Sequence, residues 1–178
     1  MESPIHFRLA EEADLPAIVN IYSKILKNQE EGKASIGWVR GVYPTEKTAR
    51  EALDKKTLYV EESQGKVCGS AVINQNQVDV YAKASWHYPA SEDQVLVLHT
   101  LTIDPEEGRR GLGEAFVRFY EELAKEKACP YLRLDTNVIN TRAQAMYKKL
   151  GYRIVGIEPT IFNGIDGVKL ILLEKALS

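Results

Sequence analysis

One stretch of the sequence, residues 95–127, constrains the fold more than any other. It begins with VLVLHTLTI at 95–103, which is apolar on both alternating faces, as in a central strand covered on both sides. It ends at 111–127, where apolar residues recur at helical spacing. The turn between them contains the three glycines Gly108, Gly111 and Gly113. A buried strand that leads through a glycine-rich turn into an amphipathic helix predicts an α/β architecture.

The rest of the chain continues this mixture of strands and helices. Strands are expected at 5–9, 57–62, 66–74, 78–82, 131–136, 152–157 and 168–175. Helices are expected at 11–27, 45–55 and 140–149, and a long loop at 28–44. No repeat or Pro/Gly/Ser-rich linker divides the 178 residues, so we expect one domain spanning 1–178.

Composition excludes several classes of partner. The 23 Lys and Arg residues nearly balance the 25 Asp and Glu residues, so we expect neither nucleic acid nor an anionic membrane as a partner. The N-terminus has no apolar core of a signal peptide, and no run is long enough to span a bilayer. Cys68 and Cys129 form neither a disulfide framework nor a metal-binding pair, so we expect free thiols, a cytoplasmic location and no metal site.

The glycine-rich turn has the properties of an anion-binding loop. Its glycines allow close approach of a ligand, and the helix that follows offers free N–H groups and a partial positive charge. Arg109 and Arg110 add two cations, which suits a pyrophosphate. The loop matches neither the Walker pattern nor the complete dinucleotide fingerprint. Two other interpretations of this segment are therefore still possible: an ordinary turn with solvated arginines, and a nucleotide-binding loop.

A second motif narrows these alternatives. NTRAQAMYKKLGY at 140–152 fits N-x-x-A-x-x-x-Y-x-x-x-G-[FY], and VLVLHTLTIDP followed by RxGxG precedes it at a compatible distance. Together they resemble the GNAT superfamily of acetyl-CoA-dependent N-acetyltransferases. The resemblance implies an α/β fold, α+β in some schemes: a mixed, mostly antiparallel sheet of about seven strands with a central, splayed parallel pair, flanked by about four helices. The family loop usually starts with Gln or Arg, where this chain has Gly108.

The resemblance also implies how acetyl-CoA would bind. The backbone of strand 95–103 would pair with the pantetheine arm, and the loop would hold the pyrophosphate. Asn140 would orient the cofactor, although it also suits a plain helix N-cap, and Glu114 suits the helix dipole. The expected cofactor-binding residues are Leu101, Thr102, Ile103, Arg109, Arg110, Gly111, Leu112, Gly113, Glu114, Asn140 and Tyr147.

The chemistry needs an acid and a base, because a protonated amine must become neutral and a thiolate must leave. Tyr147 matches the family's general acid, although a tyrosine on an apolar helix face is often a core residue. His99 resembles the base of the arylalkylamine branch, and its alternative is a buried structural histidine. It is expected on one strand face with Val95, Val97, Leu101 and Ile103. Glu92, Asp93 or a water chain are rival bases.

The acceptor cannot be identified from the sequence beyond a small-molecule or peptide amine. Loop aromatic residues could line its pocket, and Glu30 and Glu31 could attract a cationic amine. The aromatic candidates are Trp38, Tyr43, Trp86 and Tyr88, with His87 as a weaker one. The C-terminal strands are a candidate homodimer surface. An alternative function is a non-catalytic acyl-CoA-binding or sensing module on the same fold.

Overall fold

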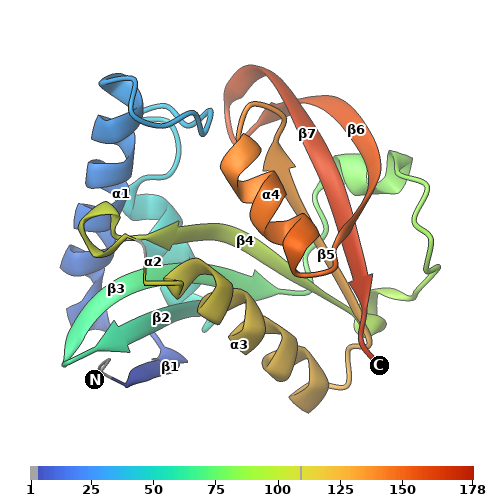
Figure 1. The fold of residues 1–178 in the computed structure, drawn as a ribbon, viewed down its shortest axis with the longest axis horizontal. Helices are drawn as coiled ribbons and strands as arrows, with labels where there is room; N and C mark the ends of the chain where they lie inside the picture. The colour runs from blue at the N-terminus through green and yellow to red at the C-terminus, as the bar shows by residue number, and fades with distance from the viewer. Residues whose placement is uncertain (1–3, 109) are drawn as a thin grey trace.

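The computed structural model describes residues 4–108 and 110–178, so Arg109 lies outside the described residues. The helices are α1 (Leu15–Glu30), α2 (Glu46–Asp54), α3 (Leu112–Glu126) and α4 (Thr141–Lys149). The strands are β1 (Ile5–Leu9), β2 (Leu58–Ser63), β3 (Lys66–Asn74), β4 (Val95–Ile103), β5 (Tyr131–Asn137), β6 (Arg153–Phe162) and β7 (Ile165–Ala176). Figure 1 shows their arrangement.

The seven strands form one sheet in the order β1-β2-β3-β4-β5-β7-β6. The β4–β5 pair is parallel, and every other pair is antiparallel. This mixed sheet with its central parallel pair and four α-helices confirms the expected fold class. The strand expected at 78–82 is wrong, because Asp79–Lys83 forms a 3-10 turn whose Val80 and Tyr81 pack against the sheet.

The parallel pair separates along its length. Pairing runs only from Val95 opposite Tyr131 to Leu98 opposite Leu134, although both strands continue beyond that point. At the paired end, the buried hydroxyl of Tyr120 on α3 lies 2.5 Å from the Leu96 carbonyl oxygen on β4 and 3.2 Å from that of Arg133 on β5. A wedge-shaped gap therefore opens between β4 and β5 towards their carboxyl ends.

A β-bulge changes which way the end of β4 faces. Thr100 has a φ of 51°, and the pairing with β3 shifts there between Ser70 and Val72. A bulge inserts an extra residue and so reverses the alternation of side chains beyond it. Leu101 and Ile103 consequently pack with the cluster under α3, on the other face from Val95 and Val97. The expectation that all four share one face with His99 is wrong for this reason.

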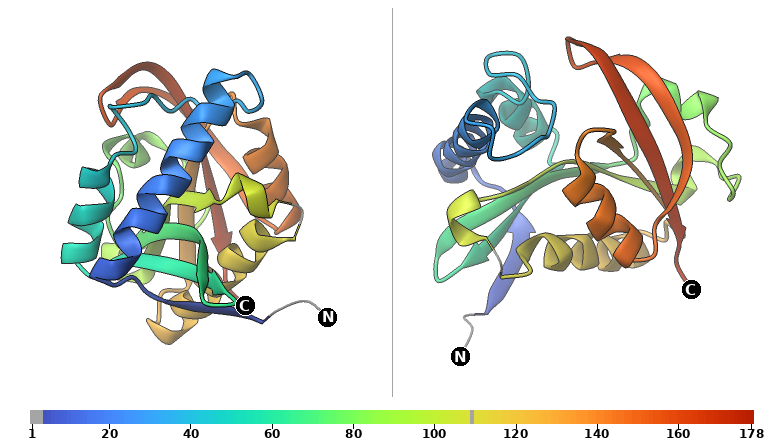
Figure 2. Two further views of the ribbon diagram at one scale, coloured as in Figure 1. Left: turned by 90° about the vertical axis from the view of Figure 1, so that its left-hand side faces the viewer. Right: turned by 45° about the horizontal axis from the view of Figure 1, so that its top comes forward.

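Helices and short turns cover both faces of the sheet. α3 and α4 pack on one face, where Phe116 and Tyr147 belong to the largest apolar cluster. α1 and α2 pack on the opposite face of the β1–β4 half, while the Asp79–Lys83 turn covers that face of the other half. Figure 2 shows these layers and the β6–β7 hairpin, which curves away from β4.

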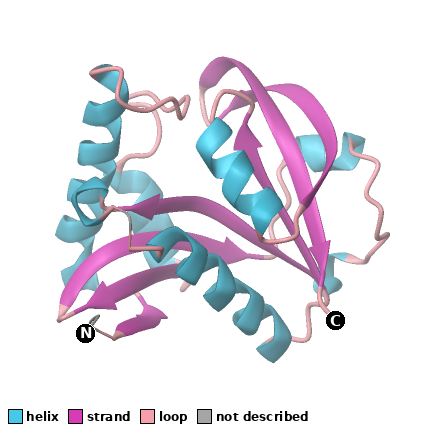
Figure 3. Cartoon of the chain, viewed as in Figure 1, coloured by secondary structure: helices cyan, strands magenta, loops and turns pink. Residues whose placement is uncertain are grey.

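The β6–β7 hairpin is longer than the two expected strands. Asn163 and Gly164 at its tip have φ values of 48° and 86°, the two left-handed residues that a type I′ turn requires. The loop that follows α1 reaches this tip, as Figure 3 shows, and the Tyr43 and Phe162 rings meet there at 5.3 Å between centroids. Loop and hairpin together close one end of the wedge.

Candidate active site

The turn after β4 is fixed by a buried aspartate. The Asp104 side chain accepts a hydrogen bond from the Glu106 backbone N–H at 3.0 Å and forms an ion pair with Lys24 at 3.1 Å. These contacts direct the chain out of the sheet before Gly108. Gly111 then adopts a φ of 69°, which favours glycine, and starts α3 without any side chain to cap it.

The start of α3 is therefore suited to bind an anion. The first backbone N–H groups of a helix have no intrahelical acceptor, and they carry the positive end of the helix dipole. Arg110 lies beside them and donates hydrogen bonds to Glu107 at 3.0 Å and to Ser63 at 3.2 Å. Unpaired N–H groups and a held guanidinium fit the diphosphate of a nucleotide-like cofactor.

The wedge between β4 and β5 forms a cavity of about 790 Å³, called the larger cavity. It brings together most of the predicted cofactor-binding residues from four separate elements. These are Leu101, Ile103, Arg110, Gly111, Leu112, Gly113, Glu114, Asn140 and Tyr147. Thr102 is not among them, because its hydroxyl bonds that of Ser70 at 2.8 Å between β4 and β3. Its side chain therefore faces away from the larger cavity.

The first turn of α4 and the first turn of α3 are held by their own contacts. The Asn140 side chain accepts the Ala143 N–H at 3.1 Å, so it is the N-cap of α4 as well as a residue of the cavity wall. Glu114 pairs with Lys149 at 2.6 Å, and this ion pair lowers the pKa of Glu114. Both helix starts are thereby fixed around the larger cavity.

Tyr147 lies at the inner end of the larger cavity and is only 5% exposed. Among the described residues its hydroxyl has no hydrogen-bond partner, although the Tyr152 ring packs against its ring at 5.8 Å between centroids. Burial, and then the nearby charge of Asp135, raise the pKa of Tyr147 well above its usual value. The phenol therefore keeps its proton at neutral pH and has that proton available to a ligand.

Asp135 on β5 is a site residue that the sequence analysis missed. It lines the larger cavity and accepts a hydrogen bond from the Tyr81 hydroxyl at 2.6 Å. Burial raises the pKa of Asp135 to about 6, and the bond from Tyr81 partly opposes this. The carboxylate is therefore mostly ionised at pH 7 and can accept a proton. The only sequence signal was one acidic residue inside the apolar strand YLRLDT.

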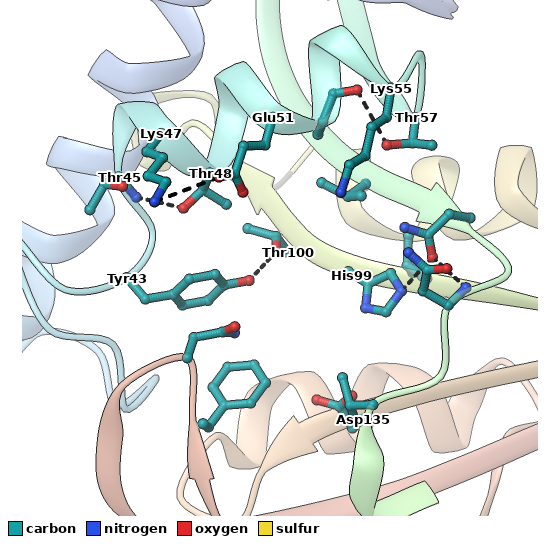
Figure 4. Close-up of a pocket in the computed structure, with 18 of the residues that line it drawn as sticks. Tyr43, Thr45, Lys47, Thr48, Glu51, Lys55, Thr57, His99, Thr100 and Asp135 are labelled. Carbon is teal, nitrogen blue, oxygen red and sulfur yellow. Dashed lines mark hydrogen bonds and ion pairs between the residues drawn. The ribbon is translucent and has the colours of Figure 1, made fainter.

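A smaller cavity of about 470 Å³ meets the larger one. The two share the wall residues Tyr43, Leu98, Thr100, Asp135 and Phe162. His99 lines the smaller cavity, shown in Figure 4, and its Nε2 lies 2.8 Å from Asn74 Oδ1. Burial lowers the pKa of His99 to about 4, so its imidazole is neutral at pH 7 and a weaker base than the Asp135 carboxylate.

The aromatic candidates divide between two places. Trp38 and Tyr43 line the cavities, and the Tyr43 hydroxyl bonds that of Thr100. Trp86 and Tyr88 line neither cavity, and Arg133 and Glu174 hold their loop beside the Asp79–Lys83 turn. Arg133 lies 4.2 Å from the Trp86 ring, and Glu174 accepts the backbone N–H of His87 at 2.6 Å. Their role in lining the acceptor pocket stays a prediction.

The remaining acidic candidates line neither cavity. Glu92 and Asp93 precede β4, at the end opposite the wedge, and line neither cavity. Glu30 pairs with Arg40 at 2.6 Å and Glu31 with Lys33 at 2.7 Å, so both charges are satisfied locally. Asp135 is thus the carboxylate that both cavities share.

Comparison with known proteins identifies the family. Residues 20–152, most of the chain and all of both motifs, match the acetyltransferase (GNAT) family. The chain belongs to this family. A Bacillus subtilis (strain 168) protein, provisionally named a [ribosomal protein bS18]-alanine N-acetyltransferase, is 39% identical over 70 residues, which are 38% of this chain and 46% of that protein. Three curated relatives are matched over only 46%, 39% and 53% of their lengths.

Solved structures of GNAT proteins share the fold over nearly the whole chain. A GNAT-family acetyltransferase from Streptococcus agalactiae 2603 has a TM-score of 0.81 and 22% identity, covering 100% of this chain and 98% of its own. The yncA protein of Salmonella typhimurium, solved with its cofactor acetyl-CoA, has a TM-score of 0.70 and 16% identity. The match covers 99% of this chain and 95% of the yncA chain. Over residues 4–108 and 110–178, this GNAT chain has no helix long and apolar enough to cross a bilayer.

Proposed function

We propose that the protein is an N-acetyltransferase that transfers the acetyl group of acetyl-CoA to an amine in a ternary complex. The observation that carries this proposal is the junction of two cavities at Asp135 and Thr100. One cavity ends at the anion-binding start of α3, and the other opens beside α2. Two substrates can therefore reach one point from separate sides, as direct transfer requires.

Acetyl-CoA fits the larger cavity. The free N–H groups at the start of α3 and Arg110 would hold its diphosphate. Beyond Leu98, the edge of β4 that faces β5 has no strand paired with it, and its backbone would bind the pantetheine amides, as we predict for Leu101 and Ile103. Asn140 and Tyr147 lie further along the same wall. The thioester supplies the activated acetyl group, and the protein supplies position and proton transfer.

Tyr147 and Asp135 are the proposed acid and base. The Asp135 carboxylate first accepts a proton from the ammonium group of the acceptor, and the neutral nitrogen then bonds to the acetyl carbon. The carbon–sulfur bond then breaks, the Tyr147 hydroxyl donates its proton to the departing thiolate, and the phenolate regains a proton from the newly bonded nitrogen. His99, our other predicted base, binds a proton more weakly than Asp135 does and lines the smaller cavity. We therefore assign it to the wall of the acceptor site.

The test is release of free CoA thiol from acetyl-CoA by the purified protein with a panel of amines. Tyr147→Phe is expected to bind acetyl-CoA normally while turnover falls by about 10²-fold or more, the low end of a proton-transfer contribution. Tyr152→Phe, which changes the neighbouring tyrosine outside the cavities, is the matched control. Tight acetyl-CoA binding without transfer to any amine would instead favour a non-catalytic sensing module.

The location of the protein stays a prediction from its cysteines. Cys68 and Cys129 are both buried free thiols, and burial raises the pKa of each. Thiols that are buried and protonated are inert and need no disulfide partner. We therefore propose the reducing cytoplasm as the compartment of this protein.

A further inference from the structure

The smaller cavity has an uneven distribution of charge between its two walls. Asp135 lies on the β5 wall, and Lys55 projects its ammonium group into the cavity from the end of α2, with His99 between them (Figure 4). Within the described part of the chain, the Lys55 ammonium has no ion-pair or hydrogen-bond partner. An unpaired cation thus faces a half-buried carboxylate across the space that the acceptor would enter.

The other charged residues of the cavity do not cancel Lys55. Lys47 and Glu51 lie on α2, one turn apart, and pair with each other at 3.7 Å. His99 is neutral at pH 7, because burial lowers its pKa to about 4. The entrance beside α2 therefore keeps one excess positive charge, while the inner wall at Asp135 is negative.

A hydrogen-bond donor, the Asn74 amide, lines the same cavity. The backbone N–H of Asn76 donates to Asn74 Oδ1 at 2.9 Å, and this donor fixes which end of the Asn74 amide is its oxygen. His99 Nε2, 2.8 Å from the same oxygen, must then be protonated and donate as well. The oxygen of Asn74 is therefore occupied twice, and its NH₂ group remains to donate to a ligand in the cavity.

We infer that the acceptor is a small amino acid, whose amine lies at Asp135 and whose carboxylate lies between Lys55 and the Asn74 amide. This inference rests on the proposed function and specifies its substrate class. A free amino acid is a zwitterion, so its two charges match the two walls of the cavity. A volume of about 470 Å³ accommodates such a molecule without a polypeptide attached to it.

The polar groups at the entrance discriminate between substrates by charge. A carboxylate would form a charge-assisted hydrogen bond with Lys55, which is stronger than one between neutral groups. The corresponding amide would leave the Lys55 ammonium without an anionic partner. A simple alkylamine would leave both Lys55 and the Asn74 amide without an acceptor. Loss of one such bond corresponds to roughly 10-fold to 100-fold in kcat/KM.

The experiment measures CoA thiol release with a panel of L-amino acids and the α-amide of each. We expect the wild-type protein to prefer at least one acid over its amide by 10-fold or more. Lys55→Ala should reduce this acid-to-amide ratio by roughly 10-fold or more, and Lys55→Arg should restore most of it. Lys56→Ala removes the same charge one residue away, outside both cavities, and should keep the ratio.

The outcomes separate the inference from the proposed function. Equal rates with acids and amides, or faster turnover with a peptide N-terminus than with any free amino acid, would overturn the amino-acid inference alone. No thiol release with any amine would overturn the proposed function and the inference with it. An acid-to-amide ratio that falls equally in Lys55→Ala and Lys56→Ala would show a general field effect and would overturn the role of Lys55.

Discussion

Glu61 on β2 provides a prediction about stability whose size follows from its environment. Its side chain is 0% exposed, and neither carboxyl oxygen has a hydrogen-bond partner among the described residues. A carboxylate without partners in the core is destabilising, because its charge has lost its hydration. Burial accordingly raises the pKa of Glu61 from 4.5 to about 8, against a smaller opposing effect of Arg110.

The sign of the pH dependence follows from this shift. Because the folded protein binds the Glu61 proton more tightly than the unfolded chain does, this group favours folding below pH 4.5 and loses that contribution as the pH rises to 8. A shift of one pKa unit is worth about 1.4 kcal/mol. Between pH 6.5 and pH 8.5 the loss amounts to about 2 kcal/mol.

Glu61→Gln removes the titrating group and keeps its shape, so the variant should lack this loss. Urea unfolding of both proteins at pH 6.5, 7.5 and 8.5 gives the free energy of unfolding at each pH. We expect the difference between variant and wild type to change by about 2 kcal/mol in favour of the variant over this range. The absolute stability at one pH is not the readout, because the glutamine amide also lacks partners.

Glu62→Gln is the matched control, because Glu62 is the next residue on β2 and pairs with Arg8 at 2.9 Å. It should change stability without changing its pH dependence between pH 6.5 and 8.5. Parallel pH profiles for wild type and Glu61→Gln would refute the reasoning. They would mean that Glu61 is ionised at neutral pH and has a partner in solution.

Two further predictions concern the base and the packing of the sheet. Because Asp135 must be ionised to accept a proton, kcat/KM should rise as the pH passes through about 6. Asp135→Asn should lower activity and remove this rise. A rise that is unchanged in the variant would mean that another group causes it. In Gly69→Ala, the new methyl would lie 2.9 Å from the Thr102 carbonyl oxygen, so we expect a loss of about 1–3 kcal/mol in urea unfolding. Gly156→Ala makes only an ordinary contact at 3.8 Å and should be nearly neutral, and equal effects of the two substitutions would contradict the steric argument.

The elements that carry the cofactor site could be predicted from the sequence because their patterns are local. The strand 95–103, the glycine-rich turn and the helix after it all depend on neighbouring residues. The bulge at Thr100 could not be predicted, because a left-handed threonine leaves no mark on the alternation of apolar residues. This bulge is what separates His99 from Leu101 and Ile103.

Two other features depend on contacts that are distant in sequence. Asp135 acquires its raised pKa only when folding buries it in the wall of the wedge. β6 extends beyond the predicted strand and includes Pro159, which is tolerated because β6 is an edge strand. The Asn163-Gly164 pair was the available signal for this hairpin.

The bridging contact of Tyr120 bears on the cost of binding a cofactor. Its hydroxyl joins carbonyl oxygens of β4 and β5 at the closed end of the wedge, and α3 packs across both strands. The angle between the strands is therefore set when the core folds, before any ligand arrives. A ligand that enters the wedge need not break a strand ladder to make room, so less of its binding free energy is lost to rearrangement of the protein.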